Sequence, residues 1–134
     1  MDAEMIIIDS DAGVMCARQK GRELAMAIGI SGSDLTLIAT AISEIARNIV
    51  QYAGQGEIEF RFVEGRGKRG LLIIARDHGP GIANIGQAMQ DGFSTSKGMG
   101  LGLSGAKRLM DDFEIVSEVG KGTTISMVKW GRSS

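Results

Sequence analysis

Asp77 is an acidic residue in a setting where its side chain could take part in chemistry. It follows the continuous apolar run 71–75, so a buried strand would deliver its carboxylate to a site as an oriented acceptor. Gly79 and Gly81 follow it by two and four residues, and glycine lets the backbone approach a ligand with no Cβ in the way. This part of the chain therefore suits a ligand that offers a hydrogen-bond donor, such as a nucleotide base.

A second glycine cluster lies further along the chain and suits phosphate. Gly98, Gly100 and Gly102 precede an amphipathic helical pattern at 103–110. Bare N–H groups at a helix N-terminus bind anions, and phosphate is the usual one. The two clusters together predict a nucleotide that lies between them.

Glu44 and Asn48 lie four residues apart in the most periodic segment, 34–53, and therefore one above the other on a helix face. An isolated pair of this kind is typical of a solvated polar face. Beside the two glycine clusters, the pair supplies what phosphoryl transfer needs. Asn48 offers a hard oxygen to Mg²⁺, and Glu44 offers an acceptor for the proton of an attacking hydroxyl.

Two other nucleotide motifs fail in this sequence. The run 100–105 reads G-L-G-L-S-G and matches G-x-G-x-x-G, but no apolar strand precedes it, which disfavours a dinucleotide fold. The P-loop pattern G-x-x-x-x-G-K-[ST] does not occur. His78, the only histidine, lies inside the glycine turn, and we expect it to face solvent rather than accept phosphate.

Length and charge limit the possible classes of function. The 134 residues fit one domain, 1–134, with a core that needs neither metal nor disulfide. A net charge of −1 gives no reason to expect nucleic acid or a membrane as partner. The single cysteine, Cys16, fits a reducing compartment, and we expect it to be buried or half-buried. Without a membrane-length apolar run or a signal-peptide pattern, the sequence predicts a cytoplasmic protein.

Apolar periodicity predicts three helices and five strands. We expect helices at 12–28, at 34–53 and from 103 to about 111, with N-caps at Ser10 or Asp11 and at Ser33. We expect strands at 5–8, 57–63, 71–75, 113–119 and 123–130. The order β-α-α-β-β-α-β-β predicts one mixed or antiparallel sheet with helices on one face.

Four blocks in one order along the chain resemble the nucleotide site of the GHKL ATPase/kinase superfamily. They are Glu44-x-x-x-Asn48, Asp77-x-Gly79-x-Gly81, Gly98-x-Gly100-x-Gly102 and Gly120-x-Gly122-Thr123. Within that superfamily, segments 40–49, 52–54, 91–96 and 107–113 resemble the RsbT-type serine/threonine switch kinases of the bacterial stressosome. The resemblance covers roughly residues 8–130. It implies an α/β two-layer sandwich (α+β) of the GHKL or Bergerat type, with a mixed sheet and three main helices on one face.

The resemblance also implies a role for each matching residue. Glu44 is similar to the catalytic base, and Asn48 to the Mg²⁺ ligand that also contacts ATP. Asp77 is similar to the acceptor for the adenine amino group, with Gly79 and Gly81 shaping the pocket. The other implied ATP contacts are Gly98, Gly100, Leu101, Gly102 and Thr123. The segment 82–97 resembles a lid, in which Phe93, Ser94, Thr95 and Lys97 would approach the nucleotide.

The implied activity is a protein kinase that uses ATP and Mg²⁺ to phosphorylate serine or threonine. Its implied partners are STAS-domain scaffold or antagonist proteins of the stressosome and, after release, a PP2C-type phosphatase. One alternative is an anti-sigma factor kinase that binds a sigma factor directly. A second is an ATP-binding interaction module without transfer activity, which intact Glu44 and Asn48 argue against. A histidine kinase is disfavoured because 134 residues leave no room for a dimerising helix pair.

Overall fold

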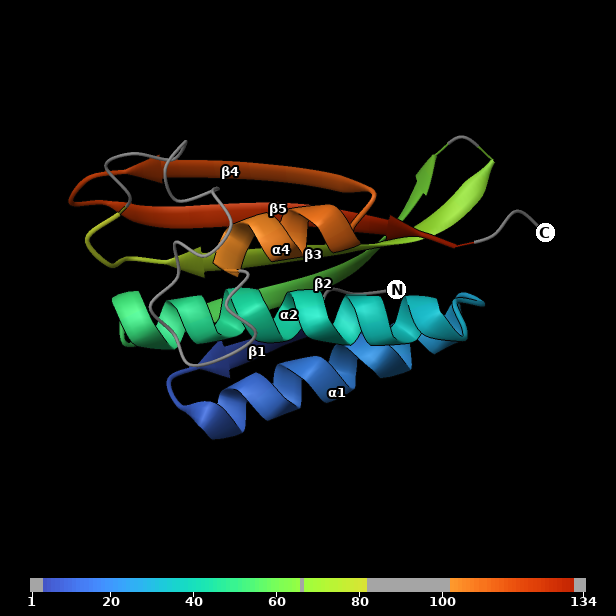
Figure 1. The fold of residues 1–134 in the computed structure, drawn as a ribbon, viewed down its shortest axis with the longest axis horizontal. Helices are drawn as coiled ribbons and strands as arrows, with labels where there is room; N and C mark the ends of the chain where they lie inside the picture. Colours follow the sequence, from blue (N-terminus) through green and yellow to red (C-terminus); the bar gives the residue numbers. More distant parts are fainter. Residues whose placement is uncertain (1–3, 66, 82–101, 132–134) are drawn as a thin grey trace.

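The computed structural model describes residues 4–65, 67–81 and 102–131. Within these ranges the protein has two layers, helices on one face of a sheet (Figure 1). The strands are β1 (Glu4–Ile8), β2 (Gly56–Gly65), β3 (Lys68–Asp77), β4 (Asp112–Glu118) and β5 (Gly122–Trp130). The helices are α1 (Asp11–Ala27), α2 (Ser33–Tyr52) and α4 (Gly102–Leu109). All eight elements expected from the apolar pattern are present.

The sheet has the strand order β1-β2-β3-β5-β4, and each neighbouring pair is antiparallel. The described sheet is thus antiparallel rather than mixed, which corrects the detail that the family resemblance implied. The reason is the position of β5. β4 runs parallel to β3, but β5 returns from β4 by a tight turn and lies between the two.

The core lies between the sheet and α2, because alternate strand residues point to one face of the sheet. α2 lies between α1 and α4 and covers the middle of that face (Figure 1). Its apolar stripe is buried, apart from a partly buried Leu35. The buried side chains that meet here are Ile38, Ile42, Ile45 and Ile49 from α2, and Ile58, Phe60, Leu71, Ile73, Ile125 and Met127 from the sheet.

Lys129 on β5 contacts both the end of α4 and the first turn of α2. Its Nζ donates to the Leu109 carbonyl at the end of α4, 3.2 Å away. The same Nζ lies 3.6 Å from Oδ1 of Asp111 and 3.9 Å from Oδ1 of Asp34 in the first turn of α2. A cation near the C-terminus of a helix also opposes the negative end of the helix dipole. This arrangement holds α4 beside α2 and over the sheet.

Three local expectations differ from the structure. Ser10 precedes α1 as expected, but its side chain makes no capping hydrogen bond. Ser33 is the first residue of α2 rather than its cap, because the chain enters through Gly32 at a φ of 63°, a conformation that favours glycine. Cys16 is exposed rather than buried, because Val14 and Ala17 take the core-facing positions of that turn.

Candidate functional site

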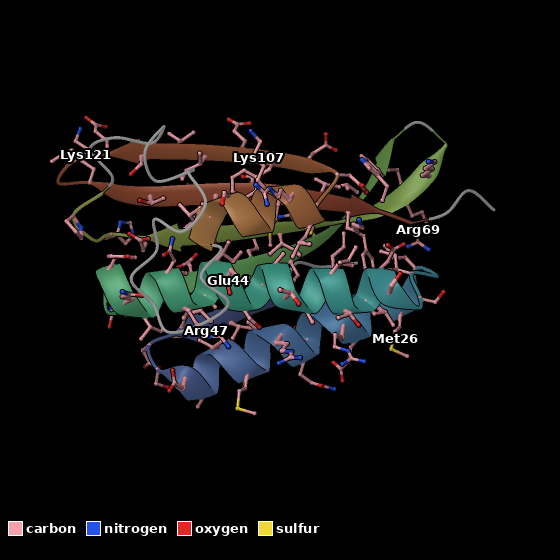
Figure 2. All side chains as sticks on the ribbon, viewed as in Figure 1. Met26, Glu44, Arg47, Arg69, Lys107 and Lys121 are labelled. Atoms are coloured by element: carbon pink, nitrogen blue, oxygen red, sulfur yellow. The ribbon has the colours of Figure 1, made fainter. Side chains whose placement is uncertain are left out.

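The second half of α2 carries a buried carboxylate, Glu44. Among the described residues, its Oε1 has no hydrogen-bond partner, and it lies 3.5 Å from Nη1 of Arg47. Figure 2 labels both residues on α2, within one turn of each other. A buried polar atom without a partner is costly, and native proteins normally match it with a water, an ion or a ligand. A solvated helix face therefore does not describe Glu44.

Asn48 follows Glu44 by one helical turn, as the spacing predicts. Its side chain is half-buried, and its amide makes no hydrogen bond to a described residue. α2 thus places an amide oxygen and a carboxylate oxygen, both with unused hydrogen-bonding capacity, on neighbouring turns.

Asp77 is the last residue of β3, as expected, and its carboxylate is oriented by the backbone that follows. Oδ1 accepts a hydrogen bond from the N–H of Gly79 at 2.9 Å. Oδ2 makes no hydrogen bond to any described residue. The turn therefore fixes the direction of the side chain and leaves one acceptor oxygen for a ligand.

The loop that follows Asp77 packs too tightly for any side chain at its glycines. A Cβ at Gly79 would lie 2.6 Å from Cβ of Ala53, the C-cap of α2. A Cβ at Gly81 would lie 2.3 Å from the Glu118 carbonyl oxygen, and the φ of Gly81 is +77°. The loop is held from the other side as well, where Gly120 N–H donates to the Pro80 carbonyl at 2.8 Å. It therefore lies between the end of α2 and the β4–β5 turn.

Thr123 lies directly opposite Asp77 in the register of β3 and β5. It is buried, and its Oγ1 lies 2.8 Å from Oγ of Ser117. Ser117 in turn donates to the Gly122 carbonyl at 3.1 Å. Gly122 itself has a φ of +107°, and a Cβ there would lie 2.0 Å from the Asp77 carbonyl oxygen. The last predicted block, 120–123, thus lies against the Asp77 turn.

The structure brings most of the described candidate residues to one end of the molecule. The ends of α2 and β3 meet at Gly56, where a Cβ would lie 2.9 Å from the Ile49 side chain and 3.1 Å from Cβ of Asp77. His78 is exposed, as expected. Gly102 is described only as the start of α4. The expected contacts Gly98, Gly100 and Leu101 and the segment 82–97, with Phe93, Ser94, Thr95 and Lys97, lie outside the described residues.

Two contacts in this region were not predicted from the sequence. Arg47 beside Glu44 could have been found, because residues three apart on a helix are neighbours. Ser117 beside Thr123 could not, because that contact depends on how β4 and β5 pair.

The described side chains fit a nucleotide and a divalent cation. Oδ2 of Asp77 is an acceptor for an amino group, beside backbone kept free of side chains at Gly79 and Gly81. The amide oxygen of Asn48 is a ligand type that Mg²⁺ accepts, and the buried Oε1 of Glu44 lies one turn away.

Residues 33–131 match the family model of histidine kinase-, DNA gyrase B- and HSP90-like ATPases. The chain belongs to this family. Over 131 residues it is 50% identical to the serine/threonine-protein kinase RsbT of Bacillus subtilis (strain 168), covering 98% of each chain. It is also 32% identical over 100 residues to an anti-sigma F factor of Clostridium kluyveri (strain NBRC 12016), covering 72% of this chain and 70% of that one.

The fold agrees with this family. The solved structure of a mycobacterial sensor histidine kinase, MprB, matches with a TM-score of 0.56 and 17% sequence identity, covering 99% of this chain and 100% of that one. Together, the family match and the 50% identity confirm the resemblance to RsbT-type kinases and the GHKL fold class. They also confirm the enzyme class. The protein is an ATP-binding serine/threonine-protein kinase.

α1, α2 and α4, the helices in the described ranges, are each too short or too polar to cross a membrane.

Proposed function

We propose that this kinase transfers the γ-phosphate of ATP to a serine or threonine of a STAS-domain protein in a bacterial stress-signalling complex. The observation that carries the proposal is the buried carboxylate of Glu44, whose Oε1 has no hydrogen-bond partner among the described residues. It lies one turn from Asn48 in a chain that is 50% identical to RsbT. On this proposal, residues 1–134 act as one GHKL kinase domain in the cytoplasm.

Asp77 is proposed to select adenine. Its free Oδ2 would accept a hydrogen bond from the amino group of the base, whereas guanine presents an oxygen at that position. Gly79 and Gly81 would let the base approach the backbone, and Thr123 would support it from the opposite strand. The proposed phosphate contacts follow the family resemblance: Gly98, Gly100, Leu101 and Gly102.

Glu44 is proposed as the general base. It would take the proton of the attacking hydroxyl, whose oxygen then bonds to the γ-phosphorus while the bond to the β–γ bridging oxygen breaks and ADP leaves. Asn48 would hold Mg²⁺ together with the phosphates, and the cation would neutralise their charge. The buried position of Glu44 keeps bulk water from the carboxylate that receives the proton.

The transfer reaction itself tests the proposal. We expect the parent protein to label a purified STAS-domain protein from the same genome with γ-labelled ATP. Glu44→Gln keeps the shape and removes the base, so it should bind ATP almost as tightly and transfer at least about a hundredfold more slowly. Asn48→Ala should instead weaken the binding of ATP that depends on Mg²⁺. Transfer by Glu44→Gln at the parent rate would show that Glu44 is not the base.

A direct anti-sigma factor role is the second candidate, favoured by the 32% identity to an anti-sigma F factor. It predicts tight binding of a sigma factor to the purified kinase and no label on STAS proteins other than an antagonist of that sigma factor. ATP binding without transfer to any protein would favour the third possibility, an interaction module. Downstream, we propose that the released kinase activates a PP2C-type phosphatase, which a phosphatase assay with and without the kinase can measure.

A further inference from the structure

The charge of Arg47 is placed unusually for a surface residue. Its side chain is 42% exposed, yet its guanidinium lies over a carboxylate that is only 2% exposed, with 3.5 Å between Nη1 and Oε1 of Glu44. This distance is long for a hydrogen bond, and the geometry does not make one. The contact is therefore a charge interaction that leaves Oε1 able to accept a hydrogen bond or a proton.

We propose that Arg47 is a positioning residue for Glu44, one that balances the buried negative charge and holds the carboxylate in place for the incoming hydroxyl. This inference rests on the proposed role of Glu44 as the base. A carboxylate this deeply buried is costly without a counter-charge, and a lysine would supply only a point charge on a more flexible chain. The planar guanidinium fixes direction as well as charge.

A second ion pair with the same spacing provides an internal control. Lys20 and Glu23 on α1 are also three residues apart, and Nζ lies 3.3 Å from Oε2. Both side chains are partly exposed, at 31% and 55%, so solvent screens their interaction. If spacing alone mattered, the two pairs would behave alike. Burial of the carboxylate predicts that only the pair on α2 is strongly coupled.

A double-mutant cycle on transfer tests the positioning role. Arg47→Gln should lower kcat about tenfold or more and change the KM for ATP by less than about twofold. Arg47→Lys should recover only part of the loss, because it restores the charge without the planar guanidinium. Arg47→Gln added to Glu44→Gln should cause no further loss, because Arg47 acts through the group already removed. Additive losses, a change confined to KM, or full activity of Arg47→Gln would each overturn the proposal. Lys20→Gln should transfer like the parent.

Urea unfolding of the same proteins gives a measurement that needs no substrate. Arg47→Gln should lower the unfolding midpoint, because it leaves a buried charge unpaired, and Glu44→Gln in that background should recover it. The Lys20→Gln and Glu23→Gln cycle should show no coupling. Absence of coupling between positions 44 and 47 would overturn the ion pair. A parent protein that transfers no phosphate would overturn the proposed function itself, and the positioning role with it.

Discussion

Asp77 illustrates how one residue can set the choice of ligand. The N–H of Gly79 holds Oδ1, so the orientation of the carboxylate is decided before a ligand arrives. Only Oδ2 is left without a described partner, and an ionised carboxylate accepts hydrogen bonds but donates none. In the proposed role, Asp77 would discriminate between bases by hydrogen-bond polarity rather than by size.

Asp77→Asn should weaken ATP binding at least about tenfold, as expected for a donor left facing another donor. The reason is that the Gly79 N–H will hold the amide oxygen and turn the NH₂ group toward the amino group of adenine. Isothermal calorimetry measures the effect, and Glu23→Gln on the outer face of α1 is the matched loss of a carboxylate. Unchanged affinity for ATP, or equal affinity of the parent for GTP, would contradict the assignment.

The Asp77 turn packs closely against the end of α2. Gly79 and Ala53 pack so closely that the adenine side of the proposed pocket depends on the position of the helix terminus. Any shift of α2 along its axis would thus move Glu44 and Asn48 together relative to the turn.

Gly79→Ala should weaken ATP binding, because the new Cβ would lie 2.6 Å from Cβ of Ala53 and the turn must move away. We expect partial recovery in Gly79→Ala/Ala53→Gly, since Cα of Ala53 would still lie 2.9 Å away. Calorimetry with ATP and urea unfolding together separate a local change from loss of the fold. ATP binding by Gly79→Ala as tight as that of the parent would show that the pocket does not depend on this contact.

Glu59 on β2 anchors the strand pair that carries Asp77. Its side chain is only 4% exposed because Arg61 and Arg76 cover it, and Nη1 of Arg76 lies 2.8 Å from its Oε1. The same nitrogen lies 3.3 Å from Oε2 of Glu57. The hydrogen bond from Arg76, and to a smaller extent the one from Arg61, lowers the pKa of the Glu59 carboxyl below its usual value of 4.5. Burial acts in the opposite direction and raises this pKa.

Glu59→Gln should lower the free energy of unfolding at neutral pH by roughly 1.5–3 kcal/mol, the range for hydrogen bonds to a charged group. A lowered pKa means that the ionised form stabilises the folded state above pH 4.5 and that this contribution is lost as the pH falls through the folded value. The difference between parent and variant should therefore shrink below about pH 4.5. Urea unfolding across pH measures it, and the exposed Glu64→Gln on the same strand is the control. A difference that stays constant into acid would contradict the ion pair.

At the scale of the whole molecule, the proposed mechanism requires another protein to bring its hydroxyl to Glu44. The described surface leaves the α2 side of the molecule without any further described element over it (Figure 1). A phosphate newly placed on the partner adds about −1.5 to −2 charges at this contact. Phosphorylation of the partner is thus expected to weaken its complex with the kinase.

We expect tight binding to the unmodified STAS-domain partner and much weaker binding to a variant whose target serine is replaced by aspartate. A serine-to-alanine variant of the partner should bind like the unmodified protein, because it adds no charge. Calorimetry or surface binding measures all three. Equal affinity for the aspartate and unmodified forms would remove the release step while leaving the kinase activity untouched.

Local patterns were enough to locate the elements and the order of the site blocks. The helix expected at 34–53 is Ser33–Tyr52, and the strand expected at 71–75 lies within Lys68–Asp77. Periodicity and turn residues act over one or two turns of chain, so they can be read without the fold. The position of Asp77 at a strand end and the spacing of Glu44 and Asn48 were determined in the same way.

The tertiary structure alone decided how those blocks meet. It buried Glu44, set Thr123 opposite Asp77, and pressed Gly79 against Ala53. It also placed β5 between β3 and β4, which made the described sheet antiparallel. Each of these features depends on how residues from different elements of the fold pack or pair with one another. Register and burial follow from the pairing and packing of all the elements at once, which no local pattern contains.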